Sequence, residues 1–503
     1  MTAIVVALLL ALLCSLVLTP VVRVIALRVG LIDKPDGHRK LHKEAVALGG
    51  GVAIAIAAFL GGALVFSFYP GWARPFQENA RFLVGLGGAA GLICLVGLMD
   101  DWLELRGRQK LAAQVVTVLI VVLGGLVIES VEIFGLRVEL GLLGIPITVC
   151  WLLGTINALN LIDGVDGLAT TVGIVLSLTM AAMALMLGHV ADALVAVAIA
   201  GGLLGFLVFN FPPAKIYMGD SGSMTIGLVL GALAIRSSLK GPATVAMAAP
   251  VLIWAVLLFD VGAAILRRKL TGQSVYTTDR GHLHHVLQKR GFSRRKIVFF
   301  IGLLCVVCGV GAMVSVYQKS ELMAIATGLT VITTLVLTQI FGHSEVSLLV
   351  RRIRSLFESM LRLPMKHKPT PKPVSSRFDG DRDWDTLWQS LLAFAEEFDL
   401  SLVQLNVNSP SIGEEFHAFW ERKEHPPQLR MWRTEVPLFH GKLAVGRLTI
   451  CGTSREGATC AWMAELIEGL KPFEQKMREL LDDQVTERIP EPKMLSPTVT
   501  AAR

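Results

Sequence analysis

The sequence predicts an α-helical multi-pass membrane protein with a small α+β domain near its C-terminal end. Of the 503 residues, 53% are hydrophobic and 17% are charged, which is less charge than a soluble protein of this size carries. The apolar residues are gathered in runs of about 20 as far as Gly342, the length that spans a bilayer. From about Arg351 onward the composition is that of an ordinary soluble protein.

About eleven membrane-spanning helices are expected, N-terminus outside and C-terminus inside. The expected spans are 3–27, 48–69, 81–99, 111–129, 146–161, 168–187, 190–209, 222–237, 243–266, 297–317 and 322–342. The first lacks the basic start and cleavage site of a signal sequence, so we interpret it as a membrane helix. If the helices alternate in direction, most Lys and Arg residues of the connections fall on one side, which marks that side as cytoplasmic. This bias, with anionic lipid contact, accounts for the formal net charge of +7, and we find no nucleic-acid motif.

Polar clusters recur where expected spans end on the cytoplasmic side. Asp100 and Asp101 close the third span. Adjacent carboxylates repel each other unless a cation or a proton lies between them. A solvated helix end is the alternative interpretation, but charged groups near a membrane are functional by default.

The stretch NALNLIDGVDGLA follows the fifth span. Its polar side chains are Asn157, Asn160, Asp163 and Asp166. Residues three apart share a helix face, and the two glycines of the stretch let the backbone approach a ligand. A simple turn is the alternative, because Asn, Asp and Gly favour turns. The pattern suits a hydrated hard cation or a phosphate better.

Two further patches lie on the same side. GDSGS, at Gly219–Ser223, is expected to begin a helix. A helix start with small residues can bind an anion, and Asp220 could bring a metal ion to that anion. The alternative is that a serine of this stretch only caps the helix. DRGHLHH follows the ninth span, and its H-x-H-H spacing is poor evidence for zinc, whereas imidazoles beside an arginine fit phosphate contact. A basic patch, DKPDGHRKLH, follows the first span.

Together these clusters predict phosphoryl transfer at the cytoplasmic membrane surface. Carboxylates and amides suit Mg²⁺, which keeps waters and bridges substrate phosphates. The basic residues suggest a nucleotide, and the apolar spans suggest a second substrate from the lipid. A transporter is one alternative, although its carboxylates would lie at mid-span rather than at helix ends. A non-enzymatic scaffold acting through the C-terminal part is another, and the intact acidic and amide motifs argue against it.

Five motifs in order resemble the polyprenyl-phosphate N-acetylhexosamine-1-phosphate transferases, the WecA, TagO and MraY superfamily of glycosyltransferase family 4. They are RKLH with a glycine pair at Arg39–Gly51, the Asp100–Asp101 pair followed by Lys110 and Gln114, NALNLIDGVDGLA, FNFPPAKIYMGDSGS and DRGHLHH. The resemblance covers roughly Leu31 to Gly291. One departure is Ala47, where the family usually has a proline before the glycine pair, which bears on the stiffness of that loop.

The resemblance implies transfer of a HexNAc-1-phosphate from a UDP-sugar to undecaprenyl phosphate with release of UMP. This is the first membrane step of a cell-surface polysaccharide, such as a cell-wall or lipopolysaccharide polymer. GlcNAc-1-phosphate is the leading candidate for the transferred group. The HLHH pattern, without an enlarged loop for a peptide, resembles the WecA and TagO branch rather than the MraY type, which takes UDP-MurNAc-pentapeptide. UDP-GalNAc and deoxy-amino sugars remain open, as does the downstream polymer.

The resemblance also implies residue roles. Mg²⁺, or Mn²⁺, would be held by Asn160 and Asp220. The implied catalytic residues are Asp100, Asp101, Asp163, His282, His284 and His285. The implied substrate-binding residues are Arg39, Lys40, His42, Lys110, Asn157, Asp166, Tyr217 and Arg280. Among these, Asp166 and Tyr217 would recognise uracil. Which aspartate, if any, acts as a base stays open, because a lipid phosphate with a second pKa of about 6 is already ionised at neutral pH.

The implied setting is the bacterial inner membrane, with membrane lipid around the protein and a cytoplasmic active site. A homodimer is one of the assemblies that the resemblance allows. We expect a transmembrane domain at 1–345, a basic linker at 346–374, an α+β domain at 375–483 and a disordered tail at 484–503. In the α+β domain we expect a helix from Trp384, a strand at SLVQLNVN, a hairpin about His440–Gly441 and a final helix at Trp462–Leu481. It shows no catalytic constellation, so we expect a regulatory role or an unknown protein partner.

Overall fold

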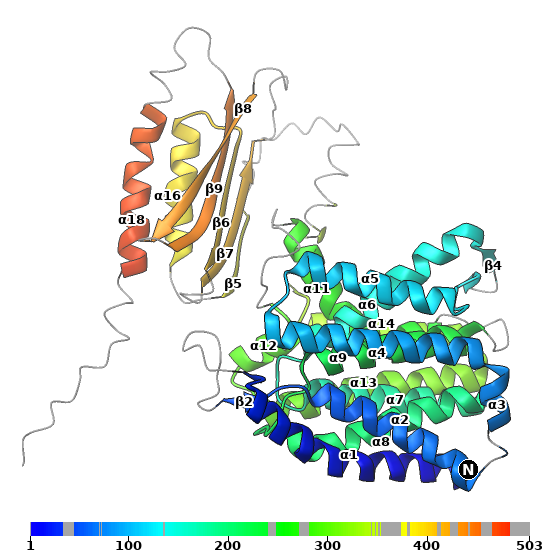
Figure 1. Ribbon diagram of the computed structural model, residues 1–503. Coiled ribbons are helices and arrows are strands. Elements are labelled where there is room, and N and C mark those ends of the chain that lie inside the picture. Colours follow the sequence, from blue (N-terminus) through cyan, green and yellow to red (C-terminus); the bar gives the residue numbers. More distant parts are fainter. Residues whose placement is uncertain are drawn as a thin grey trace, which may run out of the picture. The chain divides into compact units, whose positions relative to one another are not determined.

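The structure is a computed structural model of the chain (Figure 1). It describes residues 2–33, 45–69, 71, 73–133, 136–239, 248–270, 281–343, 345–347, 349–350, 353, 374–379, 383–409, 414–422, 431–440, 443–453 and 465–482. Four predicted site residues, most of the expected linker and the expected disordered tail lie outside the described residues. These site residues are Arg39, Lys40, His42 and Arg280. The chain divides into two compact units, Met1–Ile353 and Arg354–Arg503.

The first unit is helical. Its described α-helices are α1 (Thr2–Val29), α2 (Gly50–Phe68), α3 (Ala73–Glu78), α4 (Ala80–Leu103), α5 (Gly107–Leu123), α6 (Gly144–Ile162), α7 (Leu168–Met186), α8 (Val190–Asn210), α9 (Gly219–Leu239), α10 (Ala248–Ile253), α11 (Ala255–Leu270), α12 (Leu283–Lys289), α13 (Arg294–Gln318) and α14 (Glu321–Leu337). Seven helices of the described residues are long and apolar enough to cross a membrane, namely α1, α2, α4, α6 with its preceding turn, α7, α8 and α13. The chain is therefore a multi-pass membrane protein.

The total of eleven spans and the orientation stay predictions, and two expected boundaries were wrong. The span expected at 111–129 is α5, which ends at Leu123 because a two-glycine turn follows, with Gly125 at a φ of 98°. Strands β3 (Ser130–Ile133) and β4 (Leu136–Glu139), which we did not predict, then form a hairpin. The span expected at 243–266 is interrupted by a turn between α10 and α11.

Helix α9 lies at the centre of the first unit. Residues 221–236 are all buried, and α9 packs against α2, α4, α6 and α7. Gly227 and Gly231 make the approach to α6 possible, because a Cβ would lie 2.7 Å from the carbonyl oxygen of Thr155 at the first position and 2.1 Å from its hydroxyl at the second. Such small residues one turn apart let membrane helices approach closely. The start of α9 is therefore fixed relative to α6.

The glycine pair that starts α2 docks this helix against the segment before α9. Gly50 N–H donates to the Tyr217 carbonyl at 3.0 Å, and Gly51 N–H donates to the Met218 carbonyl at 2.9 Å. A Cβ on Gly51 would lie 2.0 Å from the backbone nitrogen of Gly222, so only glycine fits. Upstream, β2 (Val46–Ala47) pairs with β1 (Ile32–Asp33).

The second unit contains one five-stranded antiparallel sheet within its described residues. Its strands are β5 (Val374–Asp379), β6 (Leu402–Ser409), β7 (Glu414–Glu421), β8 (Met431–His440) and β9 (Leu443–Thr453), in the order β5-β7-β6-β9-β8. Helix α16 (Trp384–Glu397) packs against β6 and β7, and α18 (Lys471–Asp482) packs against α16 (Figure 1). Helix α16, strand β6 and the β8–β9 hairpin lie where the sequence predicted them, whereas β5 and β7 were not predicted.

Candidate active site

A carboxylate from α4 caps the start of α9. Asp220 N–H donates to Asp101 Oδ1 at 2.9 Å, and Ser221 N–H donates to Asp101 Oδ2 at 3.4 Å. Gly219 has a φ of 71°, and a Cβ there would lie 2.4 Å from Asp101 Oδ2. A helix N-terminus favours negative charge, so this contact stabilises both groups. The sequence predicted a ligand anion at this helix start; the structure gives these two donors to the protein's own carboxylate.

The side chain of Lys110 joins three of the predicted oxygen ligands. Its Nζ lies 2.9 Å from Asp100 Oδ2 and 3.1 Å from Asn160 Oδ1, and it also donates to Asp220 Oδ2. Asp100 Oδ1 accepts a further hydrogen bond from Leu105 N–H at 2.8 Å. Groups from α4, α6 and α9 therefore converge on one cationic atom of α5.

The two residues proposed as metal ligands are direct neighbours. Asn160 Nδ2 donates to Asp220 Oδ1 at 2.6 Å and to Ser223 Oγ at 3.0 Å. Asn160 lies in the last turn of α6 and Asp220 in the first turn of α9. The packing of α6 against α9 thus brings them together from positions 60 residues apart in the chain.

Asp163 follows α6 directly and lies near three other carboxylates. Burial raises its pKa well above the usual range, and the nearby charges of Asp220, Asp101 and Asp166 raise the pKa further. Among the described residues, its carboxylate has no hydrogen-bond or ion-pair partner. A carboxylate in this position would be stabilised by a bound cation.

These residues form what we call the acidic cluster, defined as Asp100, Asp101, Lys110, Asn160, Asp163 and Asp220. Its described members include four carboxylates and one ammonium, so the cluster has a formal excess of three negative charges when all are ionised. Excess charge of one sign in a partly buried site is costly unless a ligand of opposite sign neutralises it. The cluster is therefore a candidate cation site, and a bound cation could in turn bind a phosphate.

Asn157 takes no part in the acidic cluster. Its Nδ2 donates to Gln114 Oε1 at 2.9 Å and to the Leu153 carbonyl at 2.8 Å, and Gln114 Nε2 donates back to its Oδ1 at 3.4 Å. Gln114 is buried on α5. The amide pair joins α5 to α6 beside the cluster, so the described contacts of Asn157 are those of a helix-packing residue.

Asp166 holds the segment that precedes α9. Its Oδ2 accepts from Ala214 N–H at 3.1 Å and from Arg294 Nη1 at 3.0 Å. Tyr217 is positioned in the same segment by its N–H, which donates to the Ala47 carbonyl at 2.9 Å. Burial and the charge of Asp166 raise the pKa of Tyr217 to about 12, so its hydroxyl stays protonated at neutral pH.

Asn210, at the end of α8, organises the same loops and was missed by the sequence analysis. Its Oδ1 accepts from Thr170 Oγ1 at 2.6 Å and from Gly167 N–H at 3.1 Å, while its Nδ2 donates to the Ile216 carbonyl at 2.9 Å. It is buried, and all its polar groups are used. The one feature of the sequence that could have indicated this role is a single asparagine at the end of an apolar span.

The histidine motif lies at the start of α12. The rings of His282 and His284 are parallel at 6.1 Å, and those of His284 and His285 are 4.2 Å apart. His284 is buried, and neither ring nitrogen has a hydrogen-bond partner among the described residues. A Cβ on Gly164 would lie 2.8 Å from His284 Nε2, so the motif contacts the loop that carries Asp163.

Burial lowers the pKa of His284 well below its usual range, and the neighbouring His285 and His282 lower the pKa further. The ring is therefore neutral at neutral pH, with one donor and one acceptor. Buried polar groups are almost always hydrogen-bonded in native proteins, so this imidazole, which has no partner among the described residues, is a candidate ligand-binding group.

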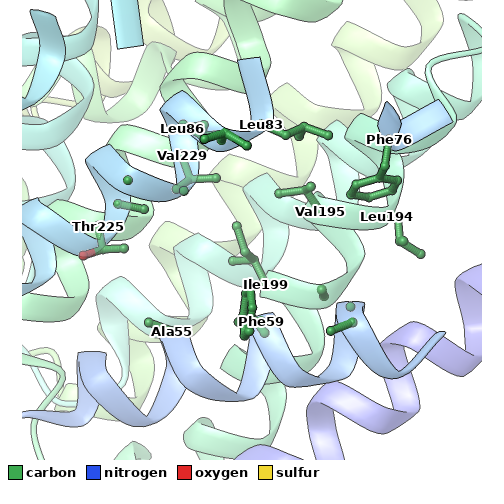
Figure 2. A pocket seen from close by; sticks show the side chains of 18 of the residues that line it. Ala55, Phe59, Phe76, Leu83, Leu86, Leu194, Val195, Ile199, Thr225 and Val229 are labelled. Carbon is green, nitrogen blue, oxygen red and sulfur yellow. The ribbon is translucent and has the colours of Figure 1, made fainter. Parts of the chain in front are cut away.

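An apolar cavity of about 660 Å³ lies among α2, α3, α4, α8 and α9 (Figure 2). Ala55, Phe59, Leu86, Ile199 and Val229 are among its lining residues, none of which is charged. One part of its wall consists of residues in the first two turns of α9, close in sequence to Asp220. The cavity suits an apolar group better than a nucleotide, because its lining is almost entirely apolar.

A family model described as glycosyl transferase family 4 matches residues 83–238, from α4 to the end of α9. The chain is also 35% identical over 316 residues to a Bacillus subtilis (strain 168) protein, in an alignment that covers 62% of this chain and 85% of that protein. The relative is described as a probable undecaprenyl-phosphate N-acetylglucosaminyl 1-phosphate transferase. The chain belongs to glycosyl transferase family 4.

Other relatives of this family 4 enzyme are similar over comparable lengths. A decaprenyl-phosphate N-acetylglucosaminephosphotransferase of Mycolicibacterium smegmatis (strain ATCC 700084 / mc(2)155) is 33% identical, covering 63% of this chain and 84% of that protein. A phospho-N-acetylmuramoyl-pentapeptide-transferase of Caldanaerobacter subterraneus subsp. tengcongensis is 30% identical, covering 57% and 88%. The family model and the two relatives described as N-acetylglucosaminyl 1-phosphate transferase and N-acetylglucosaminephosphotransferase confirm the WecA and TagO branch of the MraY superfamily for this family 4 member.

Proposed function

We propose that the protein transfers an N-acetylhexosamine 1-phosphate from a UDP-sugar to undecaprenyl phosphate and releases UMP. GlcNAc-1-phosphate is the leading candidate for the transferred group. The reaction takes place at the cytoplasmic face of the bacterial inner membrane and begins a cell-surface polysaccharide. The observation that carries the proposal is the acidic cluster, in which residues from α4, α5, α6 and α9 meet at helix ends. The names of the relatives support the same reaction.

The donor atoms of the cluster fit a magnesium ion. The oxygens of Asp100, Asn160 and Asp220 already surround a cationic group, the ammonium of Lys110. Among the described residues, no three His, Cys, Asp or Glu side chains are grouped so that they could hold a metal ion, so waters and substrate would have to supply the remaining ligands. Mg²⁺ suits such a site, because it uses one or two carboxylates and completes its shell with waters and substrate phosphates. Mn²⁺ is the alternative.

In this proposal Asn160 and Asp220 would hold the ion, with Asp163 beside them. The bound ion would neutralise negative charge on the diphosphate of the nucleotide sugar. Lys110 contributes a fixed positive charge at the same place, and the neutral His284 can bind a phosphate oxygen without adding charge. Phosphoryl transfer depends mainly on positioning the phosphates and neutralising their charge, and these groups can do both.

The transfer itself needs little proton chemistry. An oxygen of the lipid phosphate forms a bond to the sugar-linked phosphorus, and the bond from that phosphorus to the bridging oxygen breaks, so that UMP leaves with the electron pair. The lipid phosphate is already largely ionised at neutral pH, since its second pKa is about 6. Both carboxylates of the Asp100–Asp101 pair already have partners: the first pairs with Lys110, and the second accepts hydrogen bonds at the start of α9. We therefore propose that they position these groups rather than accept a proton.

The lipid substrate enters from the bilayer. In this proposal the lipid reaches the cluster between the apolar helices, and the apolar cavity that the first two turns of α9 help to line is compatible with an apolar chain. A transporter with a mid-membrane ion site fits less well, because the predicted carboxylates lie in the last turn of α4, just after α6 and in the first turn of α9.

The experiment is an assay of UMP release by the purified full-length protein with undecaprenyl phosphate and Mg²⁺. UDP-GlcNAc, UDP-GalNAc and UDP-MurNAc-pentapeptide are compared, each with and without the lipid phosphate. We expect UMP from UDP-GlcNAc that depends on the lipid phosphate. UMP from the muramyl substrate alone would move the protein to the MraY type, and no UMP from any sugar nucleotide would overturn the proposal.

A further inference from the structure

Helix α11 holds the histidine motif through three consecutive residues. Asp260 Oδ1 accepts from Leu283 N–H at 2.8 Å, and Asp260 Oδ2 lies 3.0 Å from His282 Nδ1. Arg267 Nη2 donates to the Gly281 carbonyl at 2.9 Å. Asp260 and Arg267 are two helical turns apart, so they lie on the same face of α11. The backbone and first imidazole of the motif are therefore fixed by one helix.

The contact with Asp260 determines which nitrogen of His282 carries hydrogen. A carboxylate has acceptor atoms only, and one of its oxygens is used by Leu283 N–H. The other faces Nδ1, so Nδ1 carries the hydrogen and Nε2 is left for another partner. Asp260 is 3% exposed and His282 is 4% exposed, so water does not compete strongly for this bond.

We infer that Asp260 is a positioning residue for the reaction proposed above, on which this inference rests. It fixes the tautomer and the direction of the His282 ring so that Nε2 faces a phosphate oxygen of the nucleotide sugar. Carboxylates that orient metal-binding imidazoles change metal affinity or activity about 10- to 100-fold when they are replaced, and we expect a loss of similar size for this phosphate-facing imidazole.

Asparagine is the informative replacement for Asp260, because it has the same size but one acceptor and one donor. Its oxygen can accept from Leu283 N–H, but its NH₂ group then faces His282 Nδ1. That arrangement requires an unprotonated Nδ1 and moves the hydrogen to Nε2. Asp260→Asn therefore reverses the tautomer while it keeps the side-chain volume.

The first measurement is a double-mutant cycle on kcat for UMP release, with wild type, Asp260→Asn, His282→Gln and the double variant. We expect Asp260→Asn to lower kcat about 10- to 100-fold. We expect the double variant to be no slower than His282→Gln, because a residue that acts through another has no further effect once its partner is gone. If the two losses multiply in the double variant, Asp260 does not act through His282 and the inference fails.

A matched control separates positioning from folding. Asp192→Asn changes another buried aspartate of the same unit, whose carboxylate contacts Arg236 rather than the histidine motif. We expect this control to lower the Tm while the folded fraction keeps its kcat. If Asp260→Asn loses activity only in proportion to its loss of folded protein, as the control does, its role is structural and the inference is overturned.

The second measurement does not depend on turnover. Histidine-selective ¹⁵N labelling, with His282→Gln to assign the signal, reports the tautomer of His282. We expect an Nδ1–H ring in the wild type and an Nε2–H ring in Asp260→Asn; an Nε2–H ring in the wild type would refute the inference. A wild type that releases no UMP but shows the Nδ1–H ring would instead refute the proposed function and leave the contact intact.

Discussion

Two buried polar sites lie near the opposite ends of α9, and they differ in how their charges are balanced. Near the end of the helix, Arg236 Nε lies 2.7 and 2.8 Å from the two carboxylate oxygens of Asp192, and its guanidinium also lies 4.4 Å above the ring of Phe82. About 24 Å away along the same helix, at 1.5 Å per residue, Asp220 belongs to the acidic cluster. One site is neutral, whereas the other has more carboxylates than ammonium groups among the described residues.

This difference separates a site that serves the fold from a site that serves a ligand. Removing one partner of a complete buried ion pair leaves an uncompensated charge, which costs about 3–5 kcal/mol. Removing one carboxylate from a site with excess negative charge also relieves repulsion among the carboxylates that remain, so it should cost less stability. Mutations at the two ends of α9 should therefore differ, with the larger loss of stability at one end and the larger loss of activity at the other.

The largest expected effect on activity is at Asp220. We expect Asp220→Ala to lower kcat about 1000-fold or more, because this carboxylate contacts both Lys110 and Asn160 and would hold the metal ion. The Tm in metal-free buffer should fall by less than that of Asp192→Ala, because Lys110 keeps its ion pair with Asp100 when the Asp220 carboxylate is gone. UMP release and thermal unfolding of the same preparation check this, and near-normal turnover would contradict the assignment of the site.

The largest expected effect on stability is at Asp192. We expect Asp192→Ala to destabilise the protein by about 3–5 kcal/mol, because the guanidinium of Arg236 loses its carboxylate. The folded fraction should turn over UDP-sugar at the wild-type rate, because the pair lies far from the acidic cluster. A thermal scan with UMP release at low temperature checks both. A loss of kcat as large as that of Asp220→Ala would remove the distinction between the two sites.

Asp163 gives a smaller effect with a defined pH dependence. Its pKa in the folded protein is raised, so below its unfolded pKa of about 3.9 the carboxyl is protonated in both states and costs nothing. As the pH rises from there towards the folded pKa, the unfolded state loses the proton first, and the folded state becomes less stable by comparison.

We therefore expect Asp163→Asn to raise the Tm in metal-free buffer at neutral pH, with a gain that shrinks to nothing as the pH falls towards 4. The measurement is a series of thermal scans between pH 4 and pH 8 for both proteins. A gain that is constant over this range, or a lower Tm at neutral pH, would show that the carboxylate is not held in an unfavourable environment.

The smallest expected effect is that of removing the second unit. The family match ends at residue 238, and the acidic cluster and the described histidine motif lie in the first unit. We expect deletion of everything after Arg354 to leave basal UMP release unchanged, which would be consistent with a regulatory or partner-binding role. Complete loss of activity in a truncation with a wild-type Tm would show that the second unit is needed for the chemistry.

Much of the candidate site could be predicted from the sequence, because helices that alternate across a membrane bring their cytoplasmic ends together. This argument placed Asp100, Asp101, Asn160 and Asp220 on one side, and the structure brings their side chains to Lys110 or to the start of α9. It could not separate Asn160 from its neighbour Asn157. Residues three apart on a helix differ by about 60° in direction, which is enough for one amide to reach α9 and the other to reach α5.

The residues that the sequence did not reveal are single polar groups whose partners are distant in the chain. Asp260 lies within an expected apolar span, and nothing in the local pattern indicates that His282 is its partner. For the donors at the start of α9 the sequence predicted a ligand anion, because sequence alone cannot tell such a ligand from the carboxylate of Asp101. Such choices are decided by helix packing and not by local sequence.

The most direct test is a transfer assay with UDP-GlcNAc that carries ³²P in the β-phosphate, the phosphate that stays with the sugar in the proposed reaction. The wild-type protein should move the label to undecaprenyl phosphate and release unlabelled UMP, and Asp220→Ala should move none. Label that remains in released UDP would mean that the sugar alone is transferred. Equal transfer by Asp220→Ala would mean that the chemistry takes place elsewhere in the protein.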